Sequence, residues 1–444
     1  MSDTPAVAPP ELTHARILRM ALPIVISNAT VPLLGAVDTG VVGQLGQAAP
    51  IGAVGLGAVV LATLYWIFSF LRMGTSGLAA QAHGAGDEAE RSAILLRSLL
   101  IGLGAGLCFI LLQLPVIWAT FRVAPASAEV EALTRTYLSI RIWGAPATIG
   151  LYAVTGWLVA LERTRGILVL QLWMNGLNIG LDILFVLGLG YGVGGVAVAT
   201  LIAEWTGLAL GLWLCRDAFG PVLAAARARL ADAEAIRRML GVNRDIMIRS
   251  VLLQGSFTAF VFLGAGFGDV TLAANQVLLQ FLEVSAYALD GFAFAAEALV
   301  GQAVGARSVG RVRRASIMLG QWGAGGAALI ALGIALFGPA VIDLISTAPE
   351  VRAEARAYLP WLVAAPLIGV ASWIFDGIFI GATRTREMMQ AIIVSVTLYG
   401  LALLLFVPLV GNHGLWAALA VLNAARGVTM ALLYPRVERS AARV

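Results

Sequence analysis

Two acidic residues in the first half of the chain lie inside long apolar stretches. Asp38 is the one charged residue between Arg19 and Gly43, and a bilayer is crossed by about 20 apolar residues. Asp182 interrupts a second apolar stretch in the same way. A carboxylate inside a membrane helix costs roughly 2.5–3.5 kcal/mol on insertion scales, so such residues usually mark a functional site.

Amide and hydroxyl side chains are expected near Asp182. Asn175, Asn178 and Asp182 are spaced so that they share one helix face. Asp182 and Thr200 lie about nine residues on either side of one turn, which places both about 13 Å from the same surface. The simpler alternative is that Asn175, Asn178 and Thr200 only form hydrogen bonds between helices.

The side chains expected in the outer half of the membrane suit a small cation. Asp38 and Tyr137 also lie near the outer ends of their segments. Carboxylate, amide and hydroxyl oxygens are ligands for a hard cation such as Na⁺. Two close carboxyl groups can instead share a proton. The first half is therefore predicted to hold a site for Na⁺ or H⁺.

Two prolines, Pro23 and Pro32, lie in the same apolar segment as Asp38. Proline removes a backbone donor and clashes with the preceding turn, so we expect this helix to kink or hinge. A hinged membrane helix that carries one protonatable group is typical of a moving part.

The second half carries its own acids, at positions that do not match those of the first half. Glu283, Asp290 and Glu297 are spaced i, i+7, i+14 on one helical stripe, and Asp376 lies in a later apolar segment. Such acids in a cavity would attract a cationic substrate or relay protons. Alternatively, they pair with buried arginines. The candidate partners are Arg72, Arg141, Arg249 and Arg426.

The composition predicts that these residues sit in a polytopic all-α membrane protein. Of 444 residues, 60% are hydrophobic and 12% are charged, against about 25% charged in soluble proteins. The net charge of +4 comes from arginine and does not indicate nucleic-acid binding. We expect twelve transmembrane helices, near 17–42, 52–76, 94–118, 132–157, 166–188, 194–215, 245–267, 271–299, 315–340, 357–380, 388–409 and 413–434.

The loops alternate between arginine-rich and arginine-poor. Because arginine-rich loops stay inside, both termini are predicted to be cytoplasmic. We divide the chain into a tail (1–16), a first lobe (17–215), a linker (216–244), a second lobe (245–434) and a second tail (435–444). The linker mixes arginine with apolar residues, which fits either an amphipathic helix on the membrane or a solvated connector.

The two halves repeat. Motifs of the first half recur at a constant offset in the second, and Gln81-Ala82-His83-Gly84-Ala85 returns as Gln302-Ala303-Val304-Gly305-Ala306. The same offset relates Tyr137 to Tyr358, Gly156 to Gly377 and Thr164 to Thr385. Each copy holds an even number of spans, so both insert in the same orientation. Parallel repeats with a substrate path between them are typical of transporters.

Other chemistries lack a motif. The three histidines form no metal-binding pattern, and Cys108 and Cys215 have no metal-ligand spacing. No P-loop or nucleophile elbow is present, and the GxGxxG at Gly190 lies in a turn between two spans. We therefore expect no cofactor and no enzymatic activity.

These features together resemble the multidrug and toxic compound extrusion (MATE) transporters over almost the full length. The resemblance rests on two six-helix lobes, the first-span acid, the Q-A-x-G-A turns and N-x-x-L-D in the fifth span. YALDGFAFAAEALVGQAVGAR is similar to the DinF-like branch. The resemblance implies a V-shaped pair of bundles that exports organic cations or amphiphiles in exchange for H⁺ or Na⁺.

The resemblance also implies roles for single residues. Asp38 resembles the essential first-span carboxylate, and Pro23 would be the bend point of the first helix. Asp182, Asn178, Thr200 and Tyr137 would complete the cation site. If the coupling ion is Na⁺, its ligands would come from Asp38, Asn178, Asp182 and Thr200.

We therefore expect a multidrug efflux antiporter, a monomer in the bacterial inner membrane. Protonation or Na⁺ binding at Asp38 and Asp182 would let the first helix bend and release the substrate outward. A lipid-linked oligosaccharide flippase of the same superfamily would instead favour a basic cleft. An intramembrane enzyme would need a nucleophile or metal constellation, and a receptor or scaffold leaves the buried acids unexplained.

Overall fold

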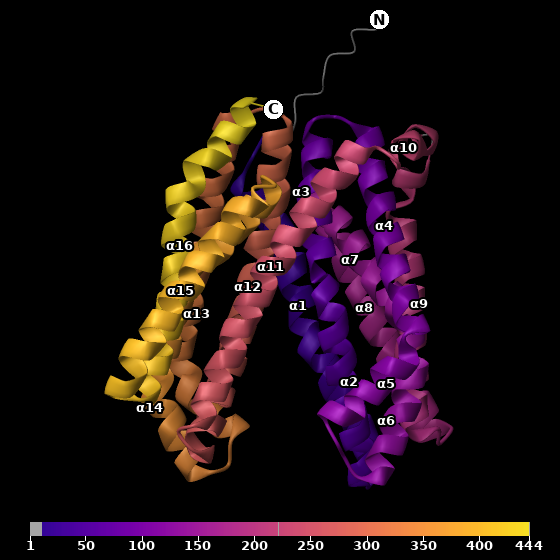
Figure 1. The fold of residues 1–444 in the computed structure, drawn as a ribbon, viewed down its shortest axis with the longest axis vertical. Helices are drawn as coiled ribbons and strands as arrows, with labels where there is room; N and C mark the ends of the chain where they lie inside the picture. Colours follow the sequence, from indigo (N-terminus) through magenta and orange to yellow (C-terminus); the bar gives the residue numbers. More distant parts are fainter. Residues whose placement is uncertain (1–10, 221, 444) are drawn as a thin grey trace, which may run out of the picture.

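Two bundles of long helices lie side by side and diverge toward one end of the molecule (Figure 1). The computed structural model describes residues 11–220 and 222–443, without the side chains of 31–36, 39 and 443. The described residues are almost entirely helical and contain no strand. The structure thus confirms the predicted all-α fold.

The first bundle is built from interrupted spans. Its α-helices are α1 (His14–Gly43), α2 (Ala48–Trp66), α3 (Phe70–Gly84), α4 (Glu88–Leu111), α5 (Gln113–Val123), α6 (Ala128–Arg141), α7 (Ala145–Ala160), α8 (Thr164–Asp182) and α9 (Gly192–Leu214). Short 3₁₀ turns join α2 to α3 (η1, Ile67–Ser69) and α6 to α7 (η2, Ile142–Gly144), and a π-helical segment follows α8 (η3, Ile183–Gly188). π-Helical turns often occur at functional sites.

The second bundle consists of longer, uninterrupted helices. They are α11 (Ala233–Ala265), α12 (Asp269–Gly305), α13 (Val309–Ile345), α14 (Pro349–Gly381), α15 (Thr385–Val410) and α16 (Asn412–Arg443). Within the described residues, eleven helical segments are long and apolar enough to cross a membrane. They do not include α1, some of whose side chains are not described. α1 itself has 30 residues, so the fold is consistent with twelve spans.

α1 runs as one helix through Pro23 and packs against both bundles, on α8 of the first and α12 of the second. Thr13 begins it, because its hydroxyl accepts a hydrogen bond from the backbone of Arg16. Pro23 is half-buried. The side chain of Pro32, the second predicted hinge, lies outside the described residues.

The internal repeat appears in the contacts between the bundles. A Cβ placed on Gly84 would lie 2.0 Å from the carbonyl oxygen of Gln302, and one on Gly305 would lie 2.0 Å from that of Gln81. The ends of α3 and α12 therefore touch backbone to backbone, at positions that the repeat offset relates to each other. This close approach explains why the repeated turn motif contains glycine.

The connection between the bundles is docked on the first of them. Two short helices, η4 (Arg216–Phe219) and α10 (Leu223–Arg229), form it together with the start of α11. Arg229 pairs with Asp87 at 2.6 Å, and the carbonyl of Arg229 accepts a hydrogen bond from Arg97 at 2.5 Å. Burial acts to raise the pKa of Asp87, but the backbone N–H of Glu90 and the Arg229 guanidinium outweigh it and hold that pKa below its ordinary value.

Candidate ion-coupling site

The two acids of the first half come together between α1 and α8. Asp182 is fully buried and Asp38 is half-buried, and the two carboxyl groups are close enough to influence each other electrostatically. Both oxygens of Asp182 and Oδ1 of Asp38 have no hydrogen-bond partner among the described residues. Two ionised carboxylates cannot donate to each other, so a bond between them requires one proton.

Asn178 places a further oxygen next to this pair. It lies one helical turn before Asp182, and its Nδ2 donates to Thr200 Oγ1 at 3.2 Å. The Thr200 hydroxyl donates in turn to the carbonyl of Val196 at 2.9 Å. Asn178 Oδ1 is buried and has no partner among the described residues. Because buried polar atoms are rarely left unpaired, these unpaired oxygens suit a proton or a cation.

Asn175 plays a different part. Its amide nitrogen donates to Thr30 Oγ1 of α1 at 3.0 Å, and its oxygen accepts from Gln171 at 3.0 Å. Both ends of the amide are thus satisfied, and the residue links α8 to α1. This is the interhelical hydrogen bonding that the sequence left open as an alternative.

Tyr137 lies beside a buried ion pair. It is 2% exposed and lies one helical turn before Arg141 on α6, whose charge acts on it. Arg141 makes a two-pronged contact with Glu204 of α9, at 2.6 and 2.9 Å. The charge of Arg141 also acts on Asp38 and Asp182.

The sequence predicts Arg141 as a candidate partner for acids of the second half. In the structure Arg141 instead pairs with Glu204, within its own half. A usable signal was present: Arg141 follows Tyr137 by one helical turn, and Glu204 follows Thr200 by the same spacing. Residues at this spacing share a helix face, so both charges face the same region as the expected ion ligands.

Two of the four acids in the second half pair with arginine. Glu297 of α12 contacts Arg72 of α3 at 3.1 and 3.2 Å, which joins the two bundles. Asp376 of α14 pairs with Arg426 of α16 at 2.6 Å and also with Arg249 of α11. For these two acids, the alternative of pairing with buried arginine describes the structure.

The other two acids make no ion pair among the described residues. Glu283 is exposed on the surface of α12, and Asp290 is half-buried two turns further along. The charges of Arg72 and Arg249 both act on Asp290. The acids of the predicted stripe on α12 therefore differ in their surroundings. Glu283 at one end is exposed, and Glu297 at the other end pairs with an arginine of the first bundle.

Two repeated helical bundles, with unpaired acids buried in one of them, define a polytopic protein with the architecture of a secondary transporter. No group of three or more metal-binding residues occurs among the described part of the chain. The MatE family model matches residues 23–184 and 246–406. The chain belongs to the MatE family.

Individual relatives agree with this assignment. DNA damage-inducible protein F of Escherichia coli K12 is 40% identical over 94% of this chain and 91% of that protein. A probable multidrug resistance protein NorM of Synechococcus is 29% identical over 74% and 71%. These relatives confirm the resemblance to the DinF-like branch and support a transporter role in a membrane.

Solved structures show the same fold. A MATE transporter of the MOP superfamily, described as an outward-facing conformation, superposes with a TM-score of 0.86. The alignment has 20% sequence identity and covers 97% of this chain and 96% of that one. At this level of identity the likeness concerns the fold alone.

Proposed function

We propose that the protein is an antiporter that exports organic cations or other amphiphiles in exchange for H⁺ or Na⁺. The observation that carries the proposal is the group of buried, unpaired oxygens on Asp38, Asp182 and Asn178. A site of this kind, held between α1 and α8, would bind a small cation and lose it when the helices separate. We further propose that the protein works as a monomer.

The ion would couple to substrate through α1. Near Pro23, α1 is held against the second bundle, because a Cβ on Gly291 of α12 would lie 2.7 Å from the carbonyl oxygen of Ala21. Neutralising Asp38 would remove a buried charge and allow the part of α1 beyond Pro23 to bend. That bend would narrow the space in the first bundle and displace the substrate.

We also propose which end of the molecule faces the cytoplasm. The start of α1, the start of α13 and the end of α16 adjoin through Trp322–His14 and Arg313–Glu438 hydrogen bonds. The arginine-rich connections lie at this end, so by the positive-inside rule it would face the cytoplasm. The bundles diverge at the opposite end (Figure 1), which corresponds to a state open to the outside.

A flippase for lipid-linked oligosaccharides fits the charges less well. Such a protein would be expected to present free cations to an anionic lipid. Here Arg72 contacts Glu297, and Arg249 and Arg426 both contact Asp376. The charges of Arg72 and Arg249 also act on Asp290, so three acids accompany these three arginines. This balance favours a cationic or amphiphilic substrate.

The test is efflux of ethidium in inverted vesicles, with pH and Na⁺ gradients imposed separately. Wild-type protein should transport under one of the two gradients, which identifies the ion. Asp38→Asn should insert normally and lose at least about tenfold of that activity, because a neutral amide cannot exchange a proton or balance Na⁺. Retained efflux by this variant would refute the assignment of Asp38.

A further inference from the structure

Arg141 is a permanent cation close to the two acids of the ion-coupling site. Its pairing with Glu204 is two-pronged, and each side chain is 9% exposed. Arginine does not lose its proton in proteins, so an unpaired Arg141 would seek another carboxylate. The helix α9 packs against α6, α8 and α1, and the charge of Arg141 already acts on Asp38 and Asp182. These two acids are therefore alternative partners for Arg141.

We propose that Glu204 holds Arg141 away from Asp38 and Asp182 and thereby keeps these two acids free to bind and release the coupling ion. Glu204 would then be a positioning residue that never touches the ion itself. This inference rests on the proposed function, since it assigns a regulator to the same site.

The packing of the first bundle is built around this ion pair. A Cβ on Gly144 would lie 2.1 Å from Glu204 Oε2 and 3.2 Å from Arg141 Nη1. A Cβ on Gly57 would lie 2.4 Å from the ring of Tyr137. Gly144, which ends the 3₁₀ turn between α6 and α7, makes room for the ion pair, and Gly57 makes room for the ring of Tyr137. The backbone at Gly144 therefore leaves room for the contact between Arg141 and Glu204.

The second bundle supplies an internal comparison. By the offset that relates Gln81 to Gln302, Arg141 matches Leu362 and Asp182 matches Leu403. For the last helix of each bundle, we align two glycines that have similar positive φ angles. Gly192 begins α9 and has a φ of +55°, and Gly411 directly precedes α16 and has a φ of +59°.

The offset between these two glycines is slightly shorter than the general offset between the repeats. Applied to the last helices, it matches Glu204 to Asn423. Leucine thus stands where the first bundle has Asp182 and Arg141, and a neutral amide stands where it has Glu204. The second bundle therefore replaces the coupling acid and the ion pair together.

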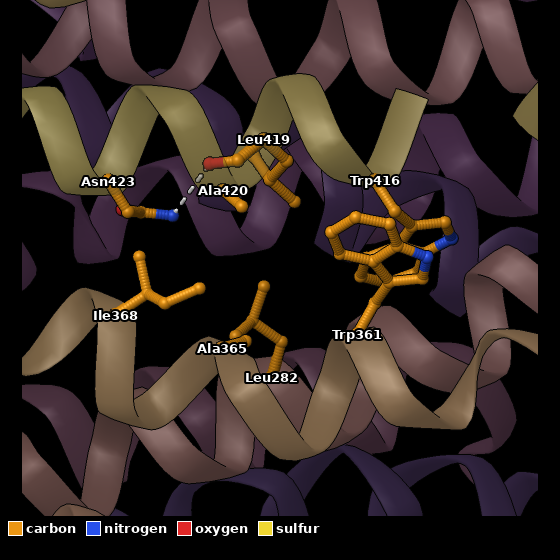
Figure 2. Close-up of a pocket in the computed structure, with 8 residues that line it drawn as sticks. All are labelled: Leu282, Trp361, Ala365, Ile368, Trp416, Leu419, Ala420 and Asn423. Carbon is orange, nitrogen blue, oxygen red and sulfur yellow. Dashed lines mark hydrogen bonds between the residues drawn. The ribbon is translucent and has the colours of Figure 1, made fainter. Parts of the chain in front are cut away.

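Figure 2 shows what occupies the matching place in the second bundle. An apolar pocket lies there between α12, α14 and α16, with Trp361 and Trp416 at one end and Asn423 at the other. The Asn423 amide donates to the carbonyl of Leu419 at 3.2 Å. The oxygen of Asn423 accepts a hydrogen bond from Arg426 at 3.1 Å, and the charge of Arg426 is met by Asp376. In the second bundle, the residue that matches Glu204 is therefore not the carboxylate of an ion pair. The pair in the first bundle accompanies the acids, which indicates a role tied to them.

The experiment compares Glu204→Gln with the double variant Arg141→Gln/Glu204→Gln. Ethidium efflux is measured beside labelling of Asp38 and Asp182 by dicyclohexylcarbodiimide, which reacts with protonated carboxyls in apolar surroundings. In Glu204→Gln, Arg141 should pair with the acids, so efflux and labelling should both fall at least about tenfold. In the double variant both should return, because the cation is gone.

Controls separate positioning from stability. Glu297→Gln breaks another two-pronged pair, Arg72–Glu297, and should leave labelling of Asp38 and Asp182 at the wild-type level. Thermal unfolding in detergent reports whether each variant is folded. If Glu204→Gln does not accumulate, Glu204→Asp replaces it. Aspartate has a shorter side chain, so it should hold Arg141 less firmly. Efflux and labelling of Asp38 and Asp182 should then both fall in part.

Three results would overturn the inference: wild-type efflux in Glu204→Gln, lost efflux with unchanged labelling, or a folded double variant that stays inactive. Asp38→Asn is run in the same assay. If that variant keeps efflux, the proposed function fails. If it loses efflux while Glu204→Gln keeps it, only the role of Glu204 fails.

Discussion

Gln81 and Gln302 occupy matching positions in the two repeats, and each donates a hydrogen bond to the end of a helix in the other repeat. Gln81 Nε2 donates to the carbonyl of Gly381 at 3.0 Å, and Gln302 Nε2 donates to that of Ala160 at 2.9 Å. The two acceptors are themselves related by the repeat offset. Any motion that separates the bundles at this end must break both bonds.

The glycines beside these glutamines should tolerate no side chain. Gly305→Ala would drive a methyl group into the backbone carbonyl of Gln81, and we expect it to destabilise the protein by about 1–3 kcal/mol. Gly325→Ala in α13, where nothing lies within 4 Å of the added atom, is the matched control. Thermal unfolding in detergent measures both, and equal stability of the two variants would contradict the backbone contact.

The Arg72–Glu297 pair should matter more when half of it is removed than when all of it is. Glu297→Met leaves a buried guanidinium without its carboxylate, which costs about 3–5 kcal/mol in comparable pairs. The double variant Arg72→Met/Glu297→Met should recover most of that loss, because no uncompensated charge remains. Unfolding midpoints of both variants test this. A double variant less stable than the single one would show that the pair itself stabilises the contact.

The contact between the first bundle and the connection that contains α10 should weaken with pH only in strong acid. Because the native pKa of Asp87 is lowered, its contribution is complete above the ordinary value and is lost as pH falls through the lower native value. Hydrogen exchange in α10, corrected for intrinsic rates, should therefore be constant between about pH 5 and 8. Asp87→Asn should raise exchange across that range. Loosening of α10 near neutral pH in the wild type would contradict the Asp87–Arg229 contact.

Pro23→Ala tests the bend in α1. Alanine restores a backbone donor inside the helix, so the variant should be at least as stable as the wild type. If bending at this residue is needed, ethidium efflux should nevertheless fall several-fold. Pro408→Ala, in the interior of α15, controls for the general effect of removing a helix proline. Wild-type efflux in Pro23→Ala would place the moving point elsewhere.

Much of the fold follows from the sequence, because hydrophobic length and the constant offset between motifs are properties of the chain itself. Their spacing around one turn also predicts that Asp182 and Thr200 lie at the same depth, and Asp38 is expected near the outer end of its own segment. Depth alone cannot tell which arginine meets which acid, since that depends on how helices rotate and pack. Hence the sequence offered Arg72, Arg141, Arg249 and Arg426 as candidate partners for the acids of the second half. It could not assign each arginine to its acid.

The Arg141–Glu204 pair was missed for a related reason. Its counterpart in the second half is shifted, because the repeat offset shortens before α16. With the general offset, Glu204 aligns with Ala425 and not with Asn423. The stripe on α12 shows the same limit. Glu283, Asp290 and Glu297 share a helix face, yet different neighbours leave them exposed, half-buried and buried.

The central claim is that binding of the substrate and binding of the coupling ion at Asp38 and Asp182 exclude each other, because the bound ion lets α1 bend and narrows the space for the substrate. The most direct measurement is ion release from purified protein in weak buffer on addition of ethidium, followed by a pH indicator and a Na⁺ electrode. Wild-type protein should release H⁺ or Na⁺ in proportion to bound ethidium, and Asp38→Asn should bind ethidium without release. Equal release from both proteins would contradict the account.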